Sequence, residues 1–191
     1  MNICVYGASS NQIENKYIEL TEEFGRQLAM RGHSLVFGGG ANGIMGAAAR
    51  GCHEGNGKII GVSPKFFDIE GVLFKECTKL IYTETMRERK QIMEDNSDGF
   101  VMMPGGIGTY EEFFEILTAK QLGRHKKPIV VFNMFGFYDA MDEMIESAIV
   151  KKFIFPSVRD LYKTFENSDE ILDYLEHYEG NLVDLKEMKG L

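Results

Sequence analysis

The chain has 191 residues, of which 44% are hydrophobic and 26% are charged, and this balance excludes a wholly disordered protein. The 29 acidic and 21 basic residues give a net charge of −8, whereas nucleic acids and anionic membranes both bind basic surfaces. We therefore expect neither as a partner. The three cysteines are scattered along the chain, which is typical of a reduced protein and predicts a cytoplasmic location.

Short, continuous apolar runs alternate with longer amphipathic segments along the chain. Continuous runs are typical of parallel strands that are covered on both faces of a sheet. We expect strands at residues 3–6, 34–37, 58–62, 99–103, 128–132 and 161–165. We expect helices over residues 13–31, 43–52, 84–96, 109–122 and 137–151, and from Ser168 onward.

This alternation predicts the fold class. It favours an α/β fold with one Rossmann-like domain, in which a doubly wound parallel sheet carries helices on both faces. Residues 1–175 would form this domain, and the charged residues 176–191 would form a tail or a docked helix. Ser168 and Asp169 are the candidate N-cap residues of the last helix.

A first glycine-rich loop, residues 38–46, follows the second expected strand and opens a helix. Gly38, Gly40 and Gly43 match the dinucleotide pattern G-x-G-x-x-G. That pattern normally follows the first strand, and no carboxylate ends the next strand to hold a ribose. Two interpretations of this loop are about equally favoured. Its backbone N–H groups bind a phosphate, or its glycines serve only the geometry of a tight turn. Among these residues Gly39, Gly40 and Gly43 are candidate ligand contacts.

A second glycine-rich loop also stands between an expected strand and a helix. Its glycines and the hydroxyl of Thr109 at the helix start suit an anion. Glu111 and Glu112 follow in the first helical turn. A single carboxylate is common there because the helix dipole stabilises it, but this explains a pair of carboxylates directly behind an anion loop less easily. The candidate contacts in the loop itself are Pro104, Gly105, Gly106, Ile107 and Gly108. Both loops end strands at one rim of the sheet, which favours a nucleotide or a sugar phosphate.

Two cations interrupt the apolar face of the expected helix 84–96. Met86 and Met93 lie on one face, and the positions between them on that face hold Arg89 and Lys90. Met86 is also a candidate substrate contact. Both cations could be half-buried side chains that reach solvent, and for Lys90 alone this interpretation is favoured. Adjacent cations beside an expected anion site favour contact with phosphate and substrate, because the planar guanidinium of Arg binds an oxyanion with two hydrogen bonds.

The remaining candidates are few. Ser9 follows the first strand at the same rim, where it is either a ligand contact or a turn residue. The four histidines show no metal-ligand spacing with each other or with cysteine. We therefore expect neither a metal nor another cofactor.

The segment 104–112 reads PGG-x-G-T-x-x-E, and residues 86–90 read M-x-x-R-K. Together with the early Gly-Ala-Ser-Ser and the first glycine loop, in the same order and at similar spacing, they resemble the Lonely Guy family of cytokinin-activating phosphoribohydrolases. The resemblance runs from about residue 2 to residue 165. Bacterial members have carried the label lysine decarboxylase, although no lysine here is set up to anchor pyridoxal phosphate.

The resemblance implies an activity and its residues. Family members hydrolyse the N-glycosidic bond of cytokinin riboside 5′-monophosphates, and often of AMP, to give free base and ribose 5-phosphate. Arg89 and Glu112 would be the catalytic pair, and Lys90, residues 105–111 and Thr118 would bind the nucleotide. An acidic contact that precedes the M-x-x-R-K helix would be Asp68 or Glu70, and the choice stays open. A homodimer is expected on the same ground.

A rival interpretation is a non-catalytic module, because related Rossmann-like proteins carry molybdenum cofactor or sense nucleotides. Glu112 separates the two interpretations, since a pure anion carrier has no use for a carboxylate beside its ligand. The preferred base and the physiological role, hormone activation or salvage, are not fixed by the sequence.

Overall fold

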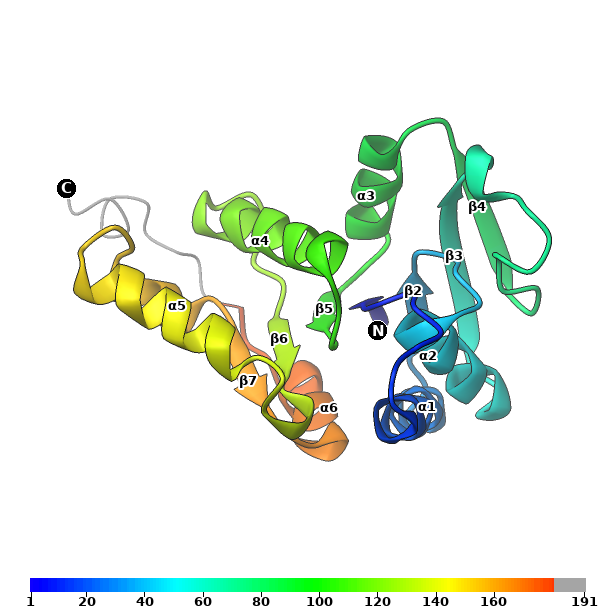
Figure 1. Cartoon of the computed structure of the whole chain (residues 1–191), viewed down its shortest axis with the longest axis horizontal. Coiled ribbons are helices and arrows are strands. Elements are labelled where there is room, and N and C mark those ends of the chain that lie inside the picture. The colour runs from blue at the N-terminus through cyan, green and yellow to red at the C-terminus, as the bar shows by residue number, and fades with distance from the viewer. Residues whose placement is uncertain (181–191) are drawn as a thin grey trace.

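The computed structural model describes residues 1–180 as a single parallel sheet with helices on both faces (Figure 1). The strands are β1 (Asn2–Tyr6), β2 (Ser34–Phe37), β3 (Lys58–Pro64), β4 (Lys79–Thr83), β5 (Gly99–Met102), β6 (Ile129–Phe132) and β7 (Lys163–Phe165). The helices are α1 (Asn15–Met30), α2 (Gly43–Glu54), α3 (Met86–Asp95), α4 (Ile107–Gln121), α5 (Asp139–Val150) and α6 (Ser168–Glu176). The expected α/β fold class is therefore confirmed.

The order of strands across the sheet is β4-β3-β2-β1-β5-β6-β7, and all neighbouring strands are parallel. The chain builds outward from β1 to β4 and then returns to the other side of β1 to place β5. This reversal puts the topological switch point between β1 and β5. Open α/β sheets bind their ligands at such a point, outside the carboxyl ends of the strands.

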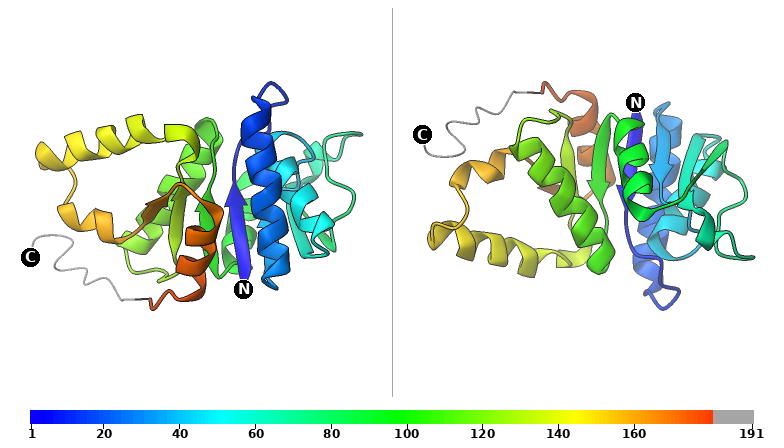
Figure 2. Two further views of the ribbon diagram at one scale, coloured as in Figure 1. Left: turned by 90° about the horizontal axis from the view of Figure 1, so that it is seen from below. Right: turned by 90° about the horizontal axis from the view of Figure 1, so that it is seen from above.

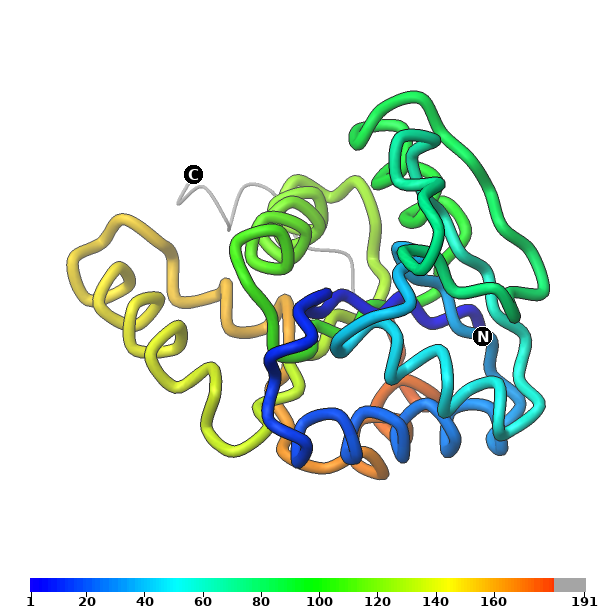
Figure 3. The backbone as a smooth tube through the Cα atoms, turned by 45° about the vertical axis from the view of Figure 1, so that its right-hand side comes forward, coloured from blue at the N-terminus to red at the C-terminus, as the bar shows by residue number. Residues whose placement is uncertain are grey.

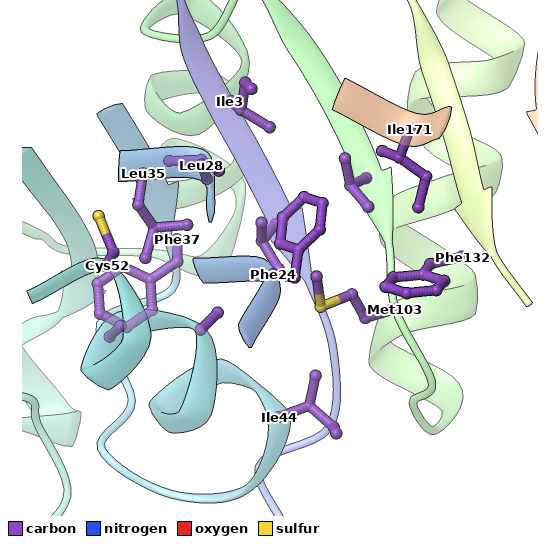
Figure 4. Packing of buried hydrophobic residues seen from close by; sticks show 14 of the residues in the cluster. Ile3, Phe24, Leu28, Leu35, Phe37, Ile44, Cys52, Met103, Phe132 and Ile171 are labelled. Carbon is purple, nitrogen blue, oxygen red and sulfur yellow. The ribbon is translucent and has the colours of Figure 1, made fainter. Parts of the chain in front are cut away.

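Helices α1, α2 and α6 cover one face of the sheet, and α3, α4 and α5 cover the other (Figure 2). Figure 4 shows how Phe24 from α1, Phe37 from β2 and Phe132 from β6 fill the first layer. Burying side chains of this size contributes roughly 1.5–3 kcal/mol each. Helix α5 lies at the far side of the molecule from β3 and β4 (Figure 3).

Three local expectations were wrong or incomplete. The sequence analysis predicted no strand at Lys79–Thr83, because this strand lies at the edge of the sheet and is mostly not buried. The last helix is capped by Asn167, whose side chain accepts from the backbone N–H of Glu170, and not by Ser168 or Asp169. Met86 and Met93 do not share the core, since Met93 is fully buried whereas Met86 is 42% exposed.

Helix α6 ends at Glu176. The expected tail or docked helix reaches beyond residue 180 and lies mostly outside the described residues. Within residues 1–180, no helix is long and apolar enough to cross a membrane.

Candidate active site

A cavity of about 520 Å³ opens at the carboxyl edge of the sheet, beside the switch point. This volume is in the range of small-molecule sites. We call it the edge cavity. Its lining residues come from β3, from the loops after β1, β2, β3 and β5, and from α2, α3 and α4: Gly7, Ala8, Ser9, Ser10, Gly38, Gly40, Asn42, Met45, Ser63, Phe67, Val72, Leu73, Met86, Arg89, Gly106, Gly108, Thr109 and Glu112.

Backbone hydrogen bonds fix the loops around the edge cavity to one another. The N–H of Ala8 donates to the carbonyl of Pro104 at 3.2 Å, and the N–H of Met45 donates to the carbonyl of Ala8 at 3.2 Å. Gly43 has a φ of +60°, and a Cβ there would lie 2.6 Å from the carbonyl oxygen of Ala8. A side chain at this position would therefore push the loop after β1 away from α2.

The N-terminus of α4 faces the cavity without a side-chain cap. Its N-cap residue is Gly106, which has no side chain to offer the first N–H groups of the helix. Those groups lack partners within the helix, and with the helix dipole they favour an anion. Thr109 is buried and packs against Gly105, where a Cβ would lie 2.1 Å from the Thr109 Oγ1. The expected anion loop therefore has suitable geometry.

Arg89 and Glu112 meet in the wall of the edge cavity. The Arg89 Nη1 donates to the Glu112 Oε1 at 2.8 Å, and the Arg89 Nε donates to the carbonyl of Val62 at 3.2 Å. Only 6% of Arg89 and 9% of Glu112 are exposed. Two charges so removed from water are maintained only because each has a partner.

Burial raises the pKa of the Glu112 carboxyl above its ordinary value of 4.5, whereas the positive charge and the hydrogen bond of Arg89 lower it. The net shift is upward. A buried carboxyl with a shifted pKa in a cavity wall is typical of a catalytic group.

Gly38 leaves the space that the guanidinium of Arg89 occupies. A Cβ on Gly38 would lie 1.9 Å from the Arg89 Nη2 and 2.9 Å from its Cζ. The first glycine loop therefore has a function that neither of the sequence interpretations included: it lets the guanidinium of Arg89 lie against the backbone.

Eight of the residues predicted from sequence line the edge cavity: Ser9, Gly40, Met86, Arg89, Gly106, Gly108, Thr109 and Glu112. Others shape the loops without lining it: Gly39, Gly43, Pro104, Gly105 and Ile107. The side chain of Ile107 is 89% exposed.

Lys90 and Glu111 lie elsewhere. They line a second cavity of about 480 Å³ between α3 and α4, which also has Glu112 in its wall. Lys90 there forms ion pairs with Glu111 and with Glu115. Thr118 is exposed on α4 and lines neither cavity.

The two candidates for the acidic contact are both exposed, and neither Asp68 nor Glu70 lines the edge cavity. They belong to a segment that we call the strap, residues 65–74. The strap runs beside the first glycine loop, where Gly40 and Leu73 form an antiparallel bridge. The N–H of Ala41 donates to the carbonyl of Val72, and the N–H of Phe74 donates to that of Gly39.

The sequence analysis missed several residues of the cavity. Ser63 lies near the end of β3, and Phe67, Val72 and Leu73 belong to the strap. The strap has no helical or strand periodicity, and its position over the glycine loop depends on the pairing with residues 39–41. The one usable signal was the strand end at Ser63 and Pro64, which lies at the same rim as the two glycine loops.

A sequence profile for the family described as "possible lysine decarboxylase" matches residues 45–175. A probable cytokinin riboside 5′-monophosphate phosphoribohydrolase of Arabidopsis thaliana is 35% identical over 177 residues, which cover 93% of this chain and 88% of the relative. The chain belongs to the Lonely Guy family. A cytokinin riboside 5′-monophosphate phosphoribohydrolase of Oryza sativa subsp. japonica is 36% identical over 185 residues, which cover 95% of this chain and 76% of the relative.

This Lonely Guy protein is also similar in fold to solved structures of proteins with much lower sequence identity. A molybdenum cofactor binding protein from Rippkaea orientalis has a TM-score of 0.69 at 17% identity, covering 92% of this chain and 93% of that chain. The molybdenum cofactor carrier protein of Chlamydomonas reinhardtii has a TM-score of 0.68 at 21% identity, covering 92% and 95%. At these identities the likeness concerns the fold.

No group of three or more His, Cys, Asp or Glu side chains that could hold a metal ion occurs within residues 1–180. The acid–base groups that face the edge cavity there are Arg89 and Glu112. The chemistry that this Lonely Guy site offers is therefore that of an ion pair beside an anion loop.

Proposed function

We propose that the protein hydrolyses the N-glycosidic bond of adenosine 5′-monophosphates, including N6-substituted ones, to give free base and ribose 5-phosphate. One observation carries this proposal: the buried Arg89–Glu112 pair stands in the wall of the cavity that the uncapped N-terminus of α4 also lines. The relatives at 33–36% identity are named as phosphoribohydrolases of this kind.

In this proposal the 5′-phosphate binds at the second glycine loop. The first N–H groups of α4, the hydroxyl of Thr109 and the dipole of the helix all favour a dianion there. Gly106 and Gly108 leave open space where a Cβ would stand, so the phosphate oxygens approach the backbone closely. The phosphate thereby anchors the ribose beside Glu112.

Glu112 then acts on the anomeric carbon. Cleavage of a glycosidic bond passes through an oxocarbenium-like sugar, and a carboxylate beside C1′ stabilises this cation. The same carboxylate accepts a proton from the attacking water, whose oxygen forms the new bond to C1′ as the bond to the base nitrogen breaks. Burial strengthens the electrostatic part of this effect, because little water screens the charges.

Arg89 has two functions in this scheme. Its Nη1 holds Glu112 in the charged form and in one orientation, and Val62 fixes the guanidinium through Nε. The departing base takes a proton from solvent, and the proton that Glu112 accepted from the attacking water returns to solvent, so one water is consumed in each turnover. The Nη2 of Arg89, close to Gly38, is placed to orient the nucleotide at the cavity wall.

The rival function is a non-catalytic carrier of a nucleotide or of molybdenum cofactor, since proteins with this fold are named as such carriers. A glycine loop and an arginine would serve a carrier equally well. The carboxylate of Glu112 favours the hydrolase, because placing a buried negative charge beside an anionic cargo weakens binding.

A screen for base release tests the proposal. The protein is incubated with each nucleoside 5′-monophosphate and with the matching nucleoside, and free base is quantified by chromatography. We expect release from adenosine-type monophosphates and a loss of about a hundredfold or more in kcat/KM without the phosphate, since each lost charged hydrogen bond costs about 1.5–3 kcal/mol. Equal rates with and without phosphate would contradict the assignment of the glycine loop.

A further inference from the structure

A buried serine of the edge cavity has no function in the scheme above. Ser63 is the next-to-last residue of β3, is fully buried and lines the cavity. Its hydroxyl makes one hydrogen bond among the described residues, a long one of 3.4 Å to the carbonyl of Pro64. A buried hydroxyl with such weak pairing costs stability, on the order of 1–3 kcal/mol when wholly unpaired, so it suits a ligand that supplies a better partner.

Apolar side chains lie beside Ser63 in the edge cavity. A Cβ built on Gly39 would lie 3.3 Å from the Ser63 Cβ and 3.7 Å from the Leu73 Cδ2, so these two side chains are neighbours. Phe67, Leu73 and Met86 line the same cavity. Ser63 thus offers one polar group at an end of the cavity that otherwise accepts hydrocarbon.

The strand order decides which part of a nucleotide reaches this end. The phosphate loop follows β5 and Ser63 lies near the end of β3, and the two strands are separated by β1 and β2. Three strand spacings are roughly 14 Å. A phosphate bound after β5 therefore directs the base, and any substituent on it, toward β3 and the strap.

We propose that Ser63 is a specificity-determining residue that binds a hydroxyl group on the N6 substituent of the base. The substrate class is an adenosine 5′-monophosphate whose N6 position carries a short hydrocarbon chain with one hydroxyl. The hydrocarbon contacts Phe67, Leu73 and Met86, and the hydroxyl pairs with Ser63. This inference rests on the proposed function for the adenosine 5′-monophosphate substrate and for the position of its phosphate.

The test compares two nucleotides that differ by this hydroxyl alone: N6-isopentenyladenosine 5′-monophosphate and its counterpart with a hydroxyl at the end of the chain. We expect the wild-type protein to favour the hydroxylated nucleotide by about tenfold in kcat/KM, which is the size of one neutral hydrogen bond. In Ser63→Ala the ratio falls to near one, through a higher KM for the hydroxylated nucleotide and with little change in kcat.

The matched control is Ser9→Ala, the same substitution after β1 rather than at the end of β3. We expect it to lower both reactions alike and to keep their ratio. Thermal unfolding of both variants checks that the fold is intact. A wild-type ratio of one, or a ratio that is equal in Ser63→Ala and in the wild-type protein, would overturn the assignment of Ser63.

Failure of the proposed function is recognised separately. If the wild-type protein releases base from neither nucleotide, the hydrolase proposal is wrong, and the dissociation constants of the two nucleotides are measured by calorimetry. A preference for the hydroxylated nucleotide that Ser63→Ala abolishes would still support the assignment. Equal dissociation constants would overturn it.

Discussion

The Arg89 Nη1 donates a hydrogen bond of 2.8 Å to the Glu112 Oε1, inside a wall where both side chains are buried. The two residues come from different helices, α3 and α4, that pack on the same face of the sheet. Their meeting point lies at the carboxyl edge, beside the loops that end β1, β2 and β5.

Glu112→Gln removes the negative charge and keeps the shape of the side chain. We expect kcat to fall by about 10²–10⁴-fold, which is the usual contribution of a positioned acid–base group, with a smaller change in KM. The readout is base release under saturating AMP. Glu115→Gln is the matched control, because Glu115 lies on the same helix, is half-exposed and does not line the edge cavity.

We expect the control to keep its turnover within about twofold, as is usual for surface substitutions. Circular dichroism of both variants checks the helix content. Wild-type turnover in Glu112→Gln would remove this carboxylate from the mechanism.

The pH dependence of kcat/KM reports the ionisation of Glu112. Its folded pKa is raised above 4.5, so the active carboxylate is lost as the pH falls through a value higher than that of an ordinary glutamate. The acid limb of the profile is therefore expected above pH 4.5. Arg89→Gln removes a charge that lowers the pKa of Glu112, so the limb moves to still higher pH.

The phosphate of the free substrate has the same pKa in both experiments. A difference between the pH profiles of the wild-type protein and Arg89→Gln is therefore caused by the protein. An acid limb that stays at the same pH in Arg89→Gln would show that the coupling between the two side chains does not govern activity.

Gly38→Ala tests the space beside the guanidinium. A Cβ at this position would lie 1.9 Å from the Arg89 Nη2, so either the loop or the arginine must move. We expect kcat/KM to fall at least tenfold, since a misplaced catalytic group loses rate steeply. Gly32→Ala is unsuitable as a control, because Gly32 has a φ of +80° that an alanine adopts only with strain. At Gly108 a Cβ would meet open space, so Gly108→Ala tests the phosphate end of the cavity separately.

Gly108→Ala is expected to raise KM for nucleotides more than it lowers kcat, because the added methyl group stands where the phosphate approaches the backbone. Melting temperatures are compared for both variants. Unchanged kinetics in Gly38→Ala with an unchanged fold would show that Arg89 does not need its observed position.

Exposed apolar side chains gather on α5 and the turn that follows it. Val150 is 71% exposed and Phe153 is 86% exposed, and Met144 and Phe155 are exposed as well. Such side chains are typical of a subunit interface. We expect a homodimer in light scattering at micromolar concentration, and a monomer for the double variant Val150→Glu, Phe153→Ser. A monomeric wild-type protein would contradict the expectation.

The parts of the molecule that obey local patterns could be predicted from the sequence. Continuous apolar runs predict the strands β1, β2, β3, β5 and β6, and the two glycine loops predict the rim of the sheet at which the edge cavity opens. Arg89 was recognisable because a charge stood where helical periodicity requires an apolar residue.

The parts set by tertiary pairing could not be predicted. Strand β4 is half-exposed at an edge, and the strap gains its place only through Gly40 and its neighbours. Lys90 belongs to the same sequence motif as Arg89. Because it is one residue further along α3, it lies about 100° further around the helix and lines the second cavity instead. The sequence around Ser63 is that of an ordinary strand end. Its proximity to Leu73 depends on the position of the strap and is visible only in the structure.

The most direct test of the central claim is the release of free adenine from AMP, measured together with AMP binding by calorimetry. The account predicts equal amounts of adenine and ribose 5-phosphate with the wild-type protein, and binding with strongly reduced release in Glu112→Gln. Binding of AMP and of N6-isopentenyladenosine 5′-monophosphate by the wild-type protein, with no base released from either, would contradict it and favour a carrier.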